Sequence, residues 1–80
     1  MDLDQIRKDI DQIDQELVAL LERRMVCVGQ IVEYKEQQSL PVLDQRRERE
    51  VLEKVGSLVT EEQYRATIQA QFQDMMKRSR

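Results

Sequence analysis

The 80-residue sequence contains no histidine and no tryptophan, and only one cysteine, one proline and two glycines. Without histidine, catalysis by an imidazole is excluded, and the single cysteine can form neither an internal disulfide nor a zinc site. Apolar runs, such as residues 18–21 and 25–28, are far shorter than the roughly 20 residues that span a bilayer. We therefore expect a protein of a reducing compartment, the cytoplasm, that holds no metal or cofactor and does not enter a membrane.

Basic residues are outnumbered, 13 against 16 acidic ones, which leaves a net charge of −3. Nonspecific binding to nucleic acid depends on positive charge, so no nucleic-acid partner is expected. The first four residues, MDLD, lack the basic and apolar regions of a signal peptide, which also favours the cytoplasm. Residues 1–80 form one domain, near the size at which a single chain has difficulty burying enough surface.

Few glycines, prolines and β-branched residues, with many Glu, Gln, Leu, Lys and Arg, predict an all-α fold. Apolar residues recur at intervals of three and four along a first helix of about residues 3–38. This apolar stripe consists of Leu3, Ile6, Ile10, Ile13, Leu17, Leu20, Val28 and Ile31. Pro41 then breaks the helix and pushes Leu40 toward extended geometry.

Two shorter helices are predicted after this break. Asp44 has the residue type of an N-cap for a second helix of about residues 45–55, which ends near Gly56. The sequence TEEQ forms a capping box, in which Thr60 precedes a third helix of about residues 61–79. The predicted fold is therefore three helices per chain, one long and two shorter.

The length of the first helix bears on assembly. At about 1.5 Å per residue it reaches roughly 50 Å, whereas a compact globule of this size spans only about 30 Å. The apolar stripe therefore outruns what the two shorter helices of the same chain can cover. A second copy is the simplest cover, and we predict an intertwined homodimer.

Two cations lie in the middle of the apolar stripe. Arg24 and Lys35 fall on its centre line, eleven residues or three helical turns apart. Such charges are costly without an anionic partner. Either one alone is explained by an ion pair with a neighbouring helix, or by Lys35 extending to solvent near the helix end. Both together, beside further charges, favour a binding site.

The shorter helices add polar candidates to this pair. Asp44 and Glu48 fall on the apolar side of the second helix, and Arg47 lies at its edge. Ser79 continues the apolar face of the third helix. Three of them have a simpler explanation: Asp44 as an N-cap, Glu48 as the ion-pair partner of Arg24 or Lys35, and Ser79 as part of a fraying last turn.

Arg7 stands apart, because it precedes Arg24 by 17 residues, or about 25 Å of helix. It is either a surface charge or part of the equivalent site of a partner subunit. Arginine forks suit carboxylates, and a lysine can donate to an oxygen that gains negative charge, so the set suits a small polyanion. Without histidine, a metal-ligand set or a Gly-rich phosphate loop, a reaction that needs only orientation and electrostatic stabilisation fits best.

These residues resemble the pattern of the all-helical (AroQ-type) chorismate mutases over nearly the whole chain. The most specific part is the spacing of Arg7, Arg24, Lys35, Arg47 and Glu48. The rest of the pattern comprises Ile6, Ile10, Asp14, Leu17, Leu20, Leu21, Pro41, Val42, Asp44, Arg49, Phe72, Met75, Met76, Ser79 and Arg80. The resemblance implies a Claisen rearrangement of chorismate to prephenate, in phenylalanine and tyrosine biosynthesis, without cofactor or metal. It also implies an intertwined dimer of three-helix chains with two shared sites.

The resemblance further implies roles by position. Arg24 and Arg47 would bind the substrate carboxylates, together with Arg7 of the other subunit. Lys35 would donate to the ether oxygen as its bond to carbon breaks, and Glu48 would hold the substrate hydroxyl. Asp44 would lie beside that hydroxyl, and Ser79 would assist a carboxylate. The apolar walls of the site would be Ile31, Val51 and Met76.

The family usually places a Gln or Glu one turn beyond the serine, as a second donor to the ether oxygen. That position would be 83, and the sequence stops at Arg80. We expect the 80-residue chain to fold but to be weakened as a catalyst, because one preorganised donor is commonly worth about 3 kcal/mol. Two alternatives stay open: an isochorismate–pyruvate lyase of the same fold, and a non-catalytic helical dimerisation or regulatory module.

Overall fold

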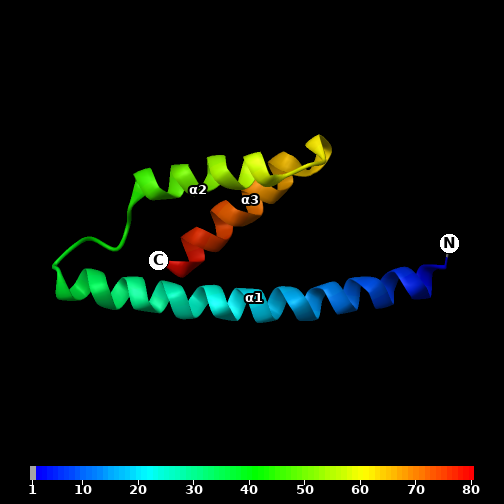
Figure 1. Ribbon diagram of the computed structural model, residues 1–80, viewed down its shortest axis with the longest axis horizontal. Helices are drawn as coiled ribbons and strands as arrows, with labels where there is room; N and C mark the ends of the chain where they lie inside the picture. Colours follow the sequence, from blue (N-terminus) through cyan, green and yellow to red (C-terminus); the bar gives the residue numbers. More distant parts are fainter. Residues whose placement is uncertain (1) are drawn as a thin grey trace. The chain divides into compact units, whose positions relative to one another are not determined.

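The computed structural model describes residues 2–80, and this part of the chain holds three helices and no strand (Figure 1). The helices are α1 (Leu3–Gln37), α2 (Gln45–Leu58) and α3 (Glu62–Ser79). The all-α prediction is thereby confirmed. The chain divides into two structural units, one that ends at Tyr34 and one that covers Lys35–Arg80.

Helix α1 is a single uninterrupted helix of 35 residues, or roughly 52 Å. Asp2 caps its start, because the Asp2 carboxylate accepts a hydrogen bond from the backbone N–H of Asp4 at 3.0 Å. At the other end Ser39 takes a left-handed conformation with φ of 55°. The backbone N–H of Leu40 then donates to the carbonyl of Lys35 at 2.8 Å, as in a Schellman motif. The helix therefore ends at Gln37, one residue before the predicted end.

The apolar stripe of α1 is exposed within this chain. No residue of α1 is buried. Its exposed large apolar side chains include Leu3, Ile6, Ile10, Ile13, Leu17, Leu20 and Ile31. A soluble monomer rarely leaves so long an apolar surface in water.

Helix α2 begins as predicted but ends later. The Asp44 carboxylate accepts a hydrogen bond from the backbone N–H of Arg47 at 3.0 Å, which confirms Asp44 as the N-cap. The predicted end at residue 55, near Gly56, is wrong, because the helix continues to Leu58 with Val59 as its C-cap. Gly56 does not adopt the positive φ of a helix-ending glycine. It is buried instead within the last turns of α2.

Helix α3 begins without the predicted capping box. Its N-cap is Glu61 rather than Thr60, and the Glu61 side chain makes no capping hydrogen bond. The backbone N–H of Tyr64 donates to the Glu61 carbonyl at 2.9 Å. The turn between α2 and α3 is held by Arg65, which donates from Nε to the Gly56 carbonyl at 2.9 Å and from Nη2 to that of Val59 at 3.2 Å. Arg65 thus satisfies carbonyls at the end of α2, whereas the capping box was predicted to satisfy N–H groups at the start of α3.

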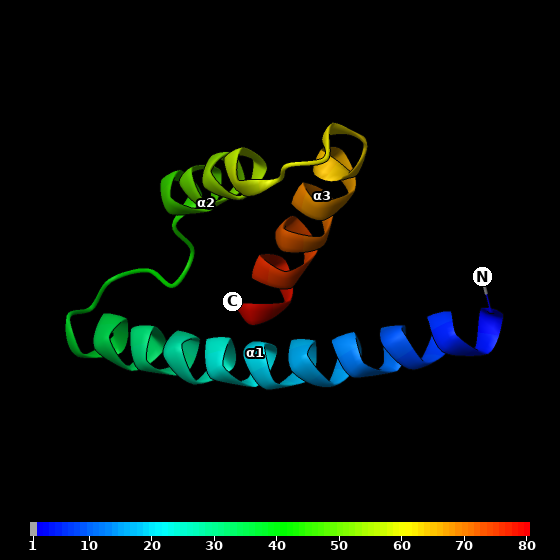
Figure 2. The ribbon, with the colours of Figure 1, turned by 45° about the vertical axis from the view of Figure 1, so that its right-hand side comes forward.

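Helices α2 and α3 form a hairpin in the second unit (Figures 1 and 2). Its buried apolar side chains are Val55 and Met76. Close approach of the helices is possible at Gly56, where a Cβ would clash with the side-chain amide of Gln69. That amide donates instead to the Leu52 carbonyl at 3.0 Å. Across residues 2–80, no helix combines the length and hydropathy needed to cross a bilayer.

Candidate functional site

Lys35 is held over the loop that joins α1 to α2. Its Nζ atom donates a hydrogen bond to the carbonyl oxygen of Val42 at 2.9 Å, and the side chain is half-buried. Within the described residues, no carboxylate forms an ion pair with it. Of the simpler explanations for this cation, an intrachain ion pair is therefore not realised. The lysine is therefore oriented by a neutral carbonyl rather than by a carboxylate.

A hollow of about 440 Å³ lies next to Lys35 in the second unit. This volume is in the range of small-molecule sites, about 300–1,000 Å³. Its lining is the end of α1, the loop and the start of α2: Lys35, Leu40, Pro41, Leu43, Asp44 and Gln45. The structure thus brings together two predicted site residues, Lys35 and Asp44, at one cavity. The Asp44 carboxylate already serves as the N-cap of α2, which was its simpler explanation.

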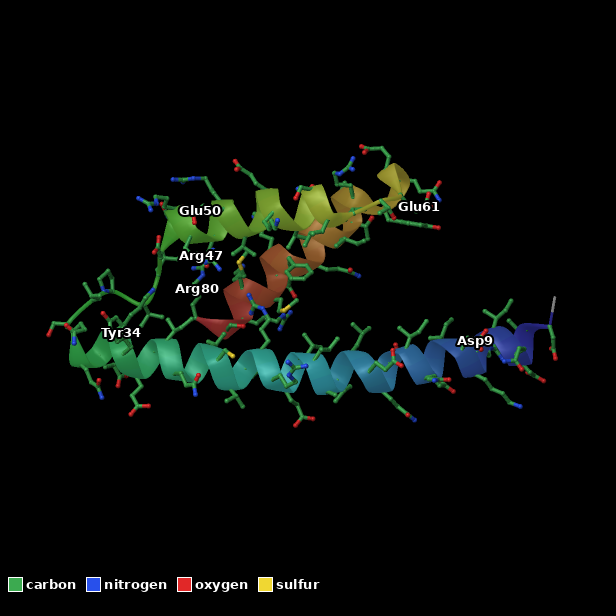
Figure 3. All side chains as sticks on the ribbon, viewed as in Figure 1. Asp9, Tyr34, Arg47, Glu50, Glu61 and Arg80 are labelled. Atoms are coloured by element: carbon green, nitrogen blue, oxygen red, sulfur yellow. The ribbon has the colours of Figure 1, made fainter. Side chains whose placement is uncertain are left out.

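Glu48 lies one helical turn beyond Asp44, and its backbone N–H donates to the Asp44 carbonyl at 3.0 Å. Its carboxylate Oε2 forms an ion pair with Nε of Arg80 at 3.2 Å, and 26% of the Glu48 side chain is exposed. The partner is therefore neither of the two stripe cations that the sequence suggested. Arg80 is the C-cap of α3 and is labelled with Arg47 in Figure 3.

Arg47 and Ser79 are both engaged locally. The Nη1 atom of Arg47 lies 3.8 Å from Oε2 of Glu50, and 69% of the arginine side chain is exposed (Figure 3). Such a pair is weak and leaves the guanidinium mobile. The Ser79 hydroxyl donates to the Met75 carbonyl at 2.7 Å, so its proton is held by its own helix.

Arg7 and Arg24 lie on α1 in the first unit. Within residues 2–34 neither forms an ion pair. One copy of α1 separates them by 17 residues, or about 25 Å, so a single small molecule cannot bind both arginines of one chain. The predicted set is therefore distributed over both units, with Lys35, Asp44, Arg47, Glu48 and Ser79 in the second.

The charges of the second unit suit an anion with polar substituents. Lys35 offers three N–H donors, and Glu48 has a second carboxylate oxygen beyond the one that Arg80 contacts. On α3, a hydrogen bond and charge interaction with Asp74 raise the pKa of Arg78, and this arginine is paired within its own helix. In residues 2–80 no three His, Cys, Asp or Glu side chains are arranged to hold a metal ion.

Arg80 belongs to the residue pattern that resembles the family, but no role in the site was predicted for it. A signal was nevertheless present, because Arg65, Gln69 and Arg80 are spaced by four and eleven residues and so share one face of α3. All three contact α2.

Comparison with known proteins gives two matches. The sequence model described as chorismate mutase type II matches residues 6–80. A bifunctional chorismate mutase/prephenate dehydratase of Aquifex aeolicus (strain VF5) is 41% identical over 54 residues, which are 68% of this chain and 15% of that protein. The chain thus corresponds to a small part of the length of this relative. No solved structure matches the chain.

Proposed function

The chain belongs to the chorismate mutase type II family, and we propose from this premise that it converts chorismate to prephenate in phenylalanine and tyrosine biosynthesis. The family match carries the proposal, because it covers residues 6–80 and therefore both structural units. The position of Lys35 at a hollow of suitable volume supports it independently. The substrate is a small dianion, which agrees with the cationic residues predicted for the site.

Catalysis would rest on binding a compact, chair-like conformer of chorismate. In the rearrangement the ether C–O bond breaks as a new C–C bond forms, and the electrons move around one ring of six atoms. No proton has to be transferred, so orientation and preorganised charge supply the acceleration. Lys35 would stabilise the negative charge that develops on the ether oxygen. A lysine has three donors, so it can do this while it remains bonded to the Val42 carbonyl.

The remaining roles follow the family pattern. Arg24 and Arg47 would bind the carboxylates, and Arg47 is free to reorient because its pair with Glu50 is exposed. Glu48 would accept a hydrogen bond from the substrate hydroxyl. Asp44 would lie beside that hydroxyl and Ser79 would assist a carboxylate. Apolar walls would come from Ile31, Val51 and Met76.

A second copy of the chain is proposed to cover α1. Helices α2 and α3 have 14 and 18 residues, or roughly 21 and 27 Å, and cannot cover the full length of α1. Burying one exposed Leu or Ile contributes about 1.5–3 kcal/mol, so pairing two apolar stripes is strongly favourable. In such a dimer each site would be shared, with Arg7 contributed by the partner subunit.

The cytoplasm remains the proposed location. Cys27 is a free, exposed thiol, which suits a reducing compartment. The proposed partners are chorismate and a second copy of the chain.

The proposed reaction is tested by mixing purified chain with chorismate, following loss of its ultraviolet absorbance and identifying the product. Prephenate formed faster than in the absence of protein supports the proposal. Pyruvate released from isochorismate, without action on chorismate, would identify a lyase. Absence of both reactions from a folded dimer would identify a non-catalytic module.

A further inference from the structure

Three contacts join α2 to α3 along one face of each helix. They link the carbonyls of Gly56 and Leu52 to Arg65 and Gln69, and the Glu48 carboxylate to Arg80. On α2 the contacted residues follow one another at intervals of four, so they lie on successive turns. Figure 2 shows the two helices diverging from their connecting turn. The third contact therefore lies at the open end of the hairpin, where the backbones are apart and a long side chain is needed.

The Glu48–Arg80 pair differs from the other ion pairs of residues 2–80. Those other pairs join residues three or four apart on a single helix, namely Arg46–Glu50, Arg47–Glu50, Arg65–Glu62 and Arg78–Asp74. Glu48 and Arg80 come from different helices, and their side chains are only 26% and 38% exposed. A partly buried pair is screened less by solvent and salt than an exposed one. The contact is thus suited to fix the position of a side chain.

We propose that Arg80 is a positioning residue for Glu48: its guanidinium holds the carboxylate so that the other oxygen faces the substrate hydroxyl. This inference rests on the proposed function. The pair uses Oε2 of Glu48 and Nε of Arg80, which leaves Oε1 as the acceptor for the hydroxyl. Arg80 acts through Glu48 and does not itself touch the reacting atoms.

Charge balance gives Arg80 a second effect on the same group. A carboxylate placed in a site for a dianion repels its ligand, and the repulsion is strong where water is excluded. A guanidinium bound to that carboxylate offsets the repulsion and leaves the oxygen able to accept a hydrogen bond. Loss of Arg80 would therefore both loosen Glu48 and raise the cost of substrate binding.

The test compares kcat and KM for chorismate with stability in five variants: Arg80→Met, Arg80→Lys, Glu48→Gln, the double variant Arg80→Met with Glu48→Gln, and Arg78→Met. Arg78→Met is the matched control, because it removes the same charge two residues away, and Arg78 pairs with Asp74 of its own helix. Arg80→Met is expected to lower kcat/KM about tenfold, the size of one lost charge-assisted hydrogen bond. The larger part should appear in KM, since the hydroxyl contact already exists in the bound substrate.

The other variants separate positioning from a structural tie. Arg80→Lys should restore activity to within about threefold of the original, because an ammonium can still donate to the carboxylate. Once Glu48→Gln has removed the charge, Arg80→Met should change kcat/KM by less than about twofold. A merely structural pair would show coupling in the free energy of unfolding and none in kcat/KM. If Arg80→Met alone folds poorly, the test rests on Arg80→Lys and on the comparison of Glu48→Gln with the double variant.

The outcomes distinguish this inference from the proposed function. An original chain without activity on chorismate overturns both. An active chain in which Arg80→Met leaves kcat/KM unchanged overturns only the role of Arg80. The same holds if Arg80→Met and Arg78→Met reduce kcat/KM equally, because the effect would then be one of general charge.

Discussion

Nε of Arg65, in the first turns of α3, lies 2.9 Å from the carbonyl oxygen of Gly56, near the end of α2. The same guanidinium donates to the Val59 carbonyl and pairs with Glu62. The last carbonyls of a helix have no partner within the helix. Arg65 supplies that partner from a neighbouring helix, and it thereby fixes how the hairpin begins.

Replacing Arg65 with Met is expected to destabilise the protein by about 1–3 kcal/mol, because the carbonyls of Gly56 and Val59 lose a side-chain donor and Gly56 keeps only the longer bond from the backbone N–H of Val59. The measurement is the free energy of unfolding in denaturant, at one protein concentration since assembly contributes to stability. Arg46→Met is the control, because Arg46 is 85% exposed and pairs only along its own helix. Equal stability of the two variants would contradict the capping role.

Replacing Gly56 with Ala is expected to have an effect that depends on Gln69. Alanine is favoured over glycine within a helix by about 0.5–1 kcal/mol. Here the new Cβ displaces the Gln69 amide, and the lost hydrogen bond to Leu52 is worth about 1 kcal/mol. The change should thus be near neutral in the original chain and stabilising in a Gln69→Ala background. Equal effects of Gly56→Ala in both backgrounds, measured by thermal unfolding, would show that Gln69 is not the obstacle.

Replacing Lys35 with Met is expected to lower kcat/KM for chorismate by about 100-fold or more, as for loss of one preorganised donor. Stability should stay level or improve, because a cation leaves an apolar stripe and takes with it only one hydrogen bond to a carbonyl. Lys54→Met, an exposed lysine of α2, is the matched control. Loss of stability with unchanged activity would instead make Lys35 a structural residue.

Replacing Ile13 with Glu tests the proposed dimer. Ile13 is 54% exposed within one chain, so the change would be nearly neutral in a monomer. In a dimer it buries a charge in the interface, and the dissociation constant should rise about 100-fold or more. The control is Gln15→Glu, which adds the same charge on the opposite face of α1. Light scattering after size exclusion measures the mass, and two variants of equal mass would contradict the interface.

Much of the fold was predictable because helices are set by local chemistry. The periodicity of apolar residues identified α1, and the carboxylate of Asp44 three residues before the N–H of Arg47 identified the start of α2. Gly56 misled for a physical reason. A glycine near a helix end usually supplies positive φ, whereas here it supplies space for Gln69, which the local sequence does not reveal.

The sequence by itself determined the three helices, the cap at Asp44 and the family to which the chain belongs. The helices and the cap depend on residues three or four apart, and the family is identified by the spacing of residues along the chain. Only the tertiary structure decided that Glu48 pairs with Arg80, that Arg65 closes the end of α2, and that Lys35 bonds to Val42. These contacts depend on how the hairpin and the loop place groups in space. Several cations and carboxylates were chemically suitable partners, and geometry selected among them.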